Sequence, residues 1–192
     1  MKTLLVSAAF AAALLAPSAA SAQAIPSAVV AVVDLDRVTS ECNACRTASA
    51  ALKSQVTSFE SRRDSLASSL QTEQKSIQTS IDALKGKQPD AALEARVKAF
   101  QAKATTSEQE LASQQSQIQR NQQYIQKQIQ DKLGPIYQQV MQRRGANLLV
   151  EVGATLATSQ NVDVTNDVLA SLNSSLPTII TTAPAQSTPQ GR

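Results

Sequence analysis

The sequence predicts a mainly α protein with a small β component, in which a long antiparallel helical hairpin stands on a β-containing base. The first observation behind this prediction is a pair of long helical stretches, separated by residues 86–90, whose apolar residues recur every seven positions. The second is a short β-branched run on each side of these stretches. The third is composition: with 3% aromatic residues and no Trp or His, the chain lacks the side chains of a bulky core and favours extended helices.

The first 22 residues are predicted to form a secretory signal peptide. Lys2 supplies a positive start, residues 4–16 form an apolar run, and residues 20–22 provide an Ala-Ser-Ala cleavage site after Ala22. The apolar run is too short to span a bilayer, and no later segment is long and apolar enough for stable membrane insertion. We therefore expect export and a mature chain that begins at Gln23.

The charge of the chain is mildly basic. The formal net charge is +3 at pH 7, and it falls by one when Lys2 leaves with the signal peptide. No dense block of Lys and Arg is present, and the pairs at residues 62–63 and 143–144 are isolated. Solvated helix faces explain such pairs better than phosphate binding does, so we predict no nucleic-acid partner.

A β-branched run at residues 29–33 is predicted to be a buried strand near the start of the mature chain. Residues 39–85 contain neither Pro nor Gly and predict the first long helix. Its residues Leu52, Phe59 and Leu66 repeat every seven positions, interleaved with Val56, Leu70, Ile77 and Leu84. This spacing aligns the apolar side chains along one seam, which needs a partner helix.

The tip of the hairpin is predicted at residues 86–90, because Gly suits the end of one helix and Pro the first turn of the next. Helical composition resumes over residues 89–144, broken by a kink at residues 134–135 and ended by Gly145. Residues 39–145 are therefore predicted to form one helical hairpin, and its two helices are called the arms. The seven-residue series of its second helix is Val97, Ala104, Leu111, Ile118 and Ile125, joined by Leu93 and Phe100.

Polar residues weaken the predicted seam. Arg63 and Glu73 occupy expected seam positions, and long polar runs such as residues 114–117 interrupt the second helix. A rigid structural coiled coil is normally better packed. We expect arms that form stably but bend.

After the hairpin, residues 148–152 are predicted as a second strand and residues 154–158 as a third, with a turn at Gly153. A short helix should follow, with Asp163 or Thr165 as its cap. Its apolar positions are Val168, Leu169 and Leu172. Strands on both sides of the hairpin are expected to share one sheet at its base. Because such a small sheet is marginal alone, the base is predicted to be an assembly surface.

These elements define the predicted organisation of the chain. Residues 28–38 and 146–175 form the base, and residues 23–176 form a single domain together with the arms. Residues 177–192 are rich in Thr, Ala, Pro, Ser and Gln, and they are predicted to be a disordered tail.

Two short segments and the order of the elements carry a resemblance to a known family. One segment is Val-Val-Asp-Leu-Asp-Arg-Val at residues 32–38. The other is Asn-Val-Asp-Val-Thr-Asn-Asp-Val-Leu at residues 161–169, which follows the apolar strand that starts at residues 148–150. Together with the signal peptide, strand, long hairpin and returning strands, they resemble the Skp/OmpH family of periplasmic chaperones over nearly the whole mature chain.

The resemblance implies a specific function. Members of the family are homotrimers whose β-containing bases pack together, while the helical arms surround a cavity. They hold unfolded outer-membrane proteins there, without ATP, as these cross the periplasm. The small net charge of this chain departs from the markedly basic character of many members. We therefore expect weaker electrostatic capture of clients, meaning the unfolded proteins that are held.

Cys42 and Cys45 are the two cysteines of the chain and form a Cys-x-x-Cys motif. In an oxidising envelope they could pair, either as a redox-active dithiol or as a disulfide that staples the start of the first arm. Side chains three apart in a helix lie about 5–6 Å from each other at Cβ. A disulfide needs roughly 3.5–4.5 Å, so pairing requires a distorted first turn. Because the chain lacks the alternating strands and helices of a thioredoxin-like enzyme, the structural disulfide is favoured.

No enzymatic site is predicted. Two Cys and no His give half of a structural zinc site, so no metal or cofactor is expected. Asp34, Asp36 and Glu41 are more simply helix N-terminal and loop charges than a general acid/base pair. No nucleophile triad or glycine-rich phosphate loop is found, so no catalytic residues are proposed.

The leading hypothesis is an ATP-independent holdase for unfolded outer-membrane proteins. The alternatives are a structural or adaptor coiled-coil protein of the cell envelope and a thiol-disulfide factor. The candidate client-facing or arm-seam residues, each of which could instead serve only packing within the hairpin, are Leu66, Leu70, Ile77, Ile81, Leu84, Leu93, Val97 and Phe100.

Overall fold

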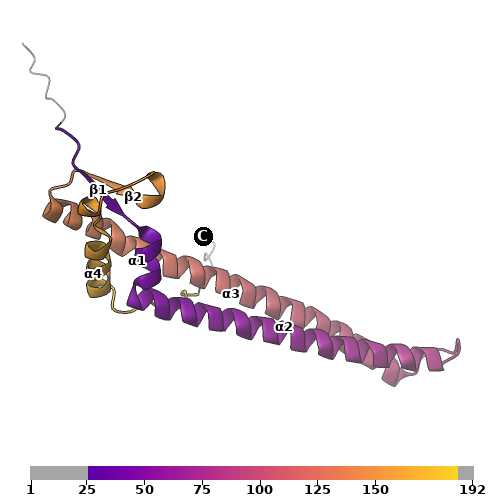
Figure 1. Cartoon of the computed structure of the whole chain (residues 1–192). Coiled ribbons are helices and arrows are strands. Elements are labelled where there is room, and N and C mark those ends of the chain that lie inside the picture. The colour runs from indigo at the N-terminus through magenta and orange to yellow at the C-terminus, as the bar shows by residue number, and fades with distance from the viewer. Residues whose placement is uncertain (1–25, 186–192) are drawn as a thin grey trace, which may run out of the picture.

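The computed structural model describes residues 26–185, so the predicted signal peptide lies outside the described residues. Figure 1 shows a small base from which a long helical hairpin projects. This architecture confirms the predicted fold class, mainly α with a small β component. In chain order the elements are β1 (Val30–Val33), α1 (Leu35–Glu41), α2 (Asn43–Ala83), α3 (Ala91–Arg144), β2 (Leu148–Glu151), the 3-10 turns η1 (Val152–Ala154) and η2 (Gln160–Val162), and α4 (Thr165–Ser175).

The sheet of the base has two parallel strands. Val30 pairs with Leu148, and the register continues to Val33 opposite Glu151. Parallel strands need a long crossover connection, and here the entire hairpin provides it. The prediction that the two β-branched runs share one sheet is therefore confirmed.

The predicted third strand at residues 154–158 is wrong. The Thr155 backbone N–H and hydroxyl both donate to the Val152 carbonyl, at 3.0 and 2.8 Å, and these bonds turn the chain out of an extended path. The place beside β1 is taken by a later segment instead. Val32 forms a parallel bridge with Asp163, and its carbonyl accepts a 2.8 Å bond from Val164 N–H.

The hydrophobic core lies in the base, where the strands meet α1, α3, α4 and the start of α2. Val38 of α1, Val140 of α3, and Val168 and Leu172 of α4 are fully buried. The strands add small side chains, among them Ala31, to the same cluster. Figure 1 shows α4 lying beside α1 and the base end of α3. The core therefore fixes both ends of the hairpin to one point.

The hairpin consists of α2 with 41 residues and α3 with 54 residues. At the α-helical rise these correspond to about 60 and about 80 Å. The turn contains Lys85 and Gly86 at positive φ, and α3 then starts at Ala91 because the Asp90 side chain accepts the Leu93 N–H at 2.8 Å. Pro89, predicted in the first helical turn, lies just before this cap.

The kink predicted at residues 134–135 does not end the helix, and α3 continues through Pro135. Proline removes one N–H from the helical ladder and usually bends or ends a helix. Here its neighbours Leu133 and Ile136 are buried in the core at 6% and 5% exposure. Packing of these flanking side chains holds the helix across the proline.

Candidate functional site

The hairpin is the candidate site, and the structure divides the predicted seam residues into three groups. Leu66 and Ile77 of α2 are buried. Ile81, near the tip, is 41% exposed. The remaining residues are half-buried: Leu70, Leu84, Leu93, Val97 and Phe100. The seam thus closes at two of the eight predicted positions and leaves apolar surface partly open at the rest.

Polar contacts join the two arms along the same length. Arg62 of α2 bonds the Glu110 carboxylate of α3 at 2.9 Å, and this hydrogen bond lowers the pKa of Glu110. Glu73, which the sequence placed in the seam, pairs with Lys103 across the hairpin at 2.8 Å. Arg63 instead lies on the surface beside its neighbour Asp64. Exposed pairs such as these contribute little stability, so they align the arms without making them rigid.

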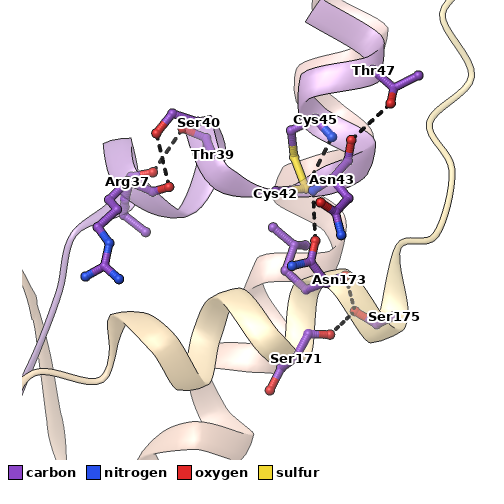
Figure 2. Close-up of a disulfide and its surroundings, with 12 residues drawn as sticks. Arg37, Thr39, Ser40, Cys42, Asn43, Cys45, Thr47, Ser171, Asn173 and Ser175 are labelled. Carbon is purple, nitrogen blue, oxygen red and sulfur yellow. Dashed lines mark hydrogen bonds between the residues drawn. A yellow bond between two sulfur atoms is a disulfide. The ribbon is translucent and has the colours of Figure 1, made fainter.

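A disulfide joins Cys42 to Cys45 at the junction of α1 and α2. Figure 2 shows it beside α4. The sequence predicted one helix from residue 39, but the chain breaks at Cys42, whose φ of −57° and ψ of 126° are not helical. This break supplies the distortion that the pairing requires, with the two Cα atoms 5.1 Å apart.

The surroundings of the disulfide are structural in character. Cys42 is 0% and Cys45 6% exposed, so an attacking thiolate has no access to the sulfur atoms. The next residue, Asn43, donates its backbone N–H to the Asn173 side chain of α4 at 2.9 Å (Figure 2). The disulfide and this bond together fix where the first arm leaves the base. This geometry favours a staple over a redox centre.

Replacing both cysteines with Ser is expected to lower the free energy of unfolding and to leave the predicted binding of unfolded clients intact. For a loop this short, chain entropy gives a loss of about 2 kcal/mol in the free energy of unfolding. Urea unfolding of the Cys42→Ser/Cys45→Ser variant, followed by circular dichroism, measures this loss. Wild-type protein that is reduced while unfolded in urea and refolded in reducing buffer is the control, and it should show the same shift. A folded variant that no longer binds clients would contradict the structural role.

The second surface of interest is the outer face of the sheet. Side chains alternate along β1 and β2, so Ala31, Val33 and Leu149 contact the core while their neighbours point to the other face. There, Val30 and Leu148 are paired and are 39% and 45% exposed. A separate open recess of about 370 Å³ lies where the strands meet α3, and its lining includes Tyr137 and Met141. Partial burial raises the pKa of Tyr137.

Clustered metal ligands and membrane-spanning helices are both absent from residues 26–185. That part of the chain contains no group of three or more His, Cys, Asp or Glu able to hold a metal ion. None of its helices is both long and apolar enough to cross a membrane.

Comparison with known proteins assigns the family. The model of the OmpH family, described as outer membrane protein (OmpH-like), matches residues 29–172. The chain belongs to this OmpH-like family. An OmpH-like protein of Caulobacter crescentus, described as an outer membrane chaperone, has a similar crystal structure, with a TM-score of 0.66 and 21% sequence identity. The similarity covers 82% of this chain and 90% of that chain. Among curated proteins, none matches this sequence.

The OmpH-like region begins just before β1 and ends inside α4, so it includes the base and both arms. The resemblance recognised from the two sequence segments is thereby confirmed. Both segments lie in the base, where Asp34 caps α1 by accepting the Arg37 N–H at 2.8 Å. The second segment binds to the first, because Asp34 N–H donates to the Thr165 hydroxyl at 2.9 Å. The family-like residues therefore tie the two halves of the base together.

Asp163 makes the OmpH-like base sensitive to acid. Hydrogen bonds from the hydroxyl and the N–H of Thr165, helped by the charge of Arg37, lower the pKa of its carboxyl. Because the folded state favours the ionised carboxylate, Asp163 stabilises the fold at pH values above its ordinary pKa of about 4. This stabilisation is lost as the pH falls through the lowered pKa of the folded state.

The melting temperature of the Asp163→Asn variant is therefore expected to decrease less than that of the wild type when the pH is lowered from 6 to 3. Thermal unfolding at both pH values measures the difference. Asp36→Asn, at an exposed carboxylate of α1, is the matched control and should behave like the wild type. Equal acid sensitivity of wild type and Asp163→Asn would contradict this role.

Proposed function

We propose that this OmpH-like protein is an ATP-independent holdase that binds unfolded outer-membrane proteins in the periplasm and prevents their aggregation. The observation that carries the proposal is a family-typical hairpin whose seam is closed at Leu66, Ile77 and Ile125 but partly open at the other six candidate positions towards the tip. Weak, distributed apolar surface on a bendable support suits a client of no fixed shape, because many weak contacts add up without requiring one folded epitope. Holding of this kind involves no catalysis.

Three copies of the chain are proposed to assemble through the base. A two-stranded sheet is too small to be stable alone, and its outer face presents the paired apolar residues Val30 and Leu148. Leu156, in the loop after β2, is fully exposed. Packing these residues against the same surface of other copies would cover them and bring three hairpins around one cavity.

The periplasmic location is proposed from the predicted signal peptide at residues 1–22 and from the cysteines. A buried structural disulfide between Cys42 and Cys45 fits an oxidising compartment and is rare in the cytosol.

The client surface is proposed to lie on the arms towards their tips. Ile81 and the five half-buried residues of the seam offer apolar contacts there, at intervals along both helices. Contacts spaced in this way can accept extended segments in several registers.

The experiment that tests the proposal measures the mass of a complex. A urea-unfolded outer-membrane barrel protein is diluted into buffer that contains the mature chain and no nucleotide, and the mixture is analysed by size-exclusion chromatography with light scattering. The expected species contains three chains and one client. A folded water-soluble protein is the control and should elute alone. Failure to retain any unfolded barrel protein, together with tight binding of one folded envelope protein, would favour the adaptor alternative.

A further inference from the structure

The segment after α4 runs along the hairpin instead of leaving it. Residues 177–192 were predicted to be a disordered tail, and for residues 177–183 this prediction is wrong. Ile179 packs against the core of the base. From there the chain continues between the arms without regular secondary structure, and Figure 1 shows the end of the described chain close to α3. Residues 186–192 lie outside the described residues.

Side-chain amides of both helices hold this segment by its main chain. Gln128 of α3 bonds both polar groups of Ile180: it donates to the carbonyl at 2.8 Å and accepts from the N–H at 2.9 Å. Gln55 of α2 donates to the Thr181 carbonyl at 3.3 Å. Further along, the Ala183 N–H donates to Asn121 at 2.8 Å. These hydrogen bonds therefore involve the peptide groups of the segment and not its side chains.

Asn121 organises the site. It is 3% exposed, and its amide nitrogen donates to Gln55 of the other arm at 2.7 Å. Its oxygen accepts from Gln117 at 2.7 Å as well as from Ala183. Gln117 also donates to the Ala183 carbonyl at 3.3 Å. Because these amides bond one another, they are oriented before a peptide binds, which reduces the entropy lost on binding.

The bound segment contributes little through its own side chains. Ile180 is 59% exposed, and Thr182 is exposed as well. Beyond Thr182 the groove continues as an open recess of about 610 Å³, with Phe59 of α2 and Ile118 of α3 in its walls. This site bonds the backbone, makes few contacts with side chains and adjoins apolar surface. These are the features needed to bind an unfolded polypeptide of any sequence.

We propose that the amide-lined groove formed by Gln55, Gln117, Asn121 and Gln128 is a binding site for the main chain of an extended polypeptide. Residues 180–183 are its resident occupant, and a client segment has to displace them. The identity of the competitor rests on the proposed holdase function, but the existence of the site does not. Because the tail is tethered, its effective concentration is high, so only a client bound at several places displaces it.

A truncated chain tests the site. Ending the protein after Ile179 removes the occupant but keeps Leu176 and Ile179 in the base, whereas ending it after Ala185 keeps every bond described above. The probe is a fluorescein-labelled peptide with the sequence of residues 178–185, followed by fluorescence anisotropy. We expect binding to the chain that ends at Ile179 and at least tenfold weaker binding to the full chain and to the chain that ends at Ala185.

Two further comparisons show that the main chain is recognised. A peptide N-methylated at Ile180 loses one hydrogen bond and should bind the chain that ends at Ile179 about tenfold more weakly. A peptide with Ala in place of Ile180 should bind within about threefold. In the same truncated chain, Gln128→Leu should weaken peptide binding about tenfold, whereas Gln126→Leu, at an exposed site on the same helix, should not.

The full-length chain provides an independent readout. Hydrogen exchange at the amides of Ile180 and Ala183 should be slow in the free protein and become fast when an unfolded outer-membrane protein is added. No binding of the peptide to the truncated chain, or equal binding of the N-methylated peptide, would overturn the site. Peptide binding without any effect of the client on exchange would instead overturn displacement and leave the site standing, which separates this outcome from failure of the holdase proposal.

Discussion

Replacing Val30 with Asp is expected to convert the proposed trimer to monomers and to abolish the proposed holding of clients. Val30 lies at the outer face of the sheet, paired with Leu148, where the proposed assembly would bury it. An unpaired carboxylate buried at such a contact costs about 3–5 kcal/mol, which weakens association by about a hundredfold or more. Three carboxylates would also approach one another around the symmetry axis. Sedimentation equilibrium measures the mass directly.

Val56→Asp is the matched control for this prediction. Val56 lies on α2 and is 37% exposed, against 39% for Val30, so the same substitution adds the same charge at a site of equal exposure. We expect a trimer for Val56→Asp and monomers for Val30→Asp, with equal helix content in both. A trimeric Val30→Asp variant would show that the outer face of the sheet is not the assembly surface.

Replacing Leu172 with Ala is expected to destabilise the base by about 2–5 kcal/mol. Leu172 of α4 is fully buried in the cluster that contains Val38, Val140 and Val168. Its truncation removes apolar contacts from a core that has few large side chains, so neighbouring residues cannot refill the space. A domain of this kind has only about 5–15 kcal/mol of stability, and the loss would therefore be a large share of it.

Urea unfolding at one fixed protein concentration measures this effect, because assembly makes stability depend on concentration. Ile180→Ala is the control, since the Ile180 side chain is 59% exposed, lies outside the base and leaves no cavity when it is removed. The expected order of unfolding midpoints places Leu172→Ala well below both the wild type and Ile180→Ala. Similar midpoints for all three proteins would contradict the assignment of the core to the base.

The parts of the fold that repeat along the sequence could be predicted. Seven-residue spacing located both arms, because a seam between helices imposes that period on any sequence that forms it. Leu66 and Ile77, both predicted to lie on the seam, are buried there. Local chemistry also sufficed for the end of α3, where Gly145 adopts the left-handed conformation that its lack of a Cβ permits.

The parts decided by tertiary contacts could not be predicted. Residues 154–158 have the composition of a strand, but the position beside β1 is occupied by Asp163 and Val164. The break at Cys42 depends on the disulfide and on Asn173 of a distant helix. One local signal was used only in part: Asp34 and Asp36 were interpreted as helix N-terminal or loop charges, but the helix start that they mark, that of α1, was not placed there.

The candidate site shows the same division. The arms could be found from periodicity, whereas the amide-lined groove could not. Gln117 belongs to the polar run at residues 114–117, which the sequence indicates only as a gap in the seam. The path of residues 180–183 gives the amides of the groove a main-chain partner, and that path depends on the packing of α4 and Ile179 against the base. Low-complexity composition alone therefore misassigned the segment as disordered.

The central claim is that the chain holds unfolded outer-membrane proteins without ATP. The most direct test is light scattering while a urea-unfolded outer-membrane barrel protein is diluted into nucleotide-free buffer that contains the mature chain at increasing ratios, counted as trimer. We predict that aggregation is suppressed and that suppression saturates near one trimer per client. Unchanged aggregation at a severalfold excess of trimer would contradict the claim.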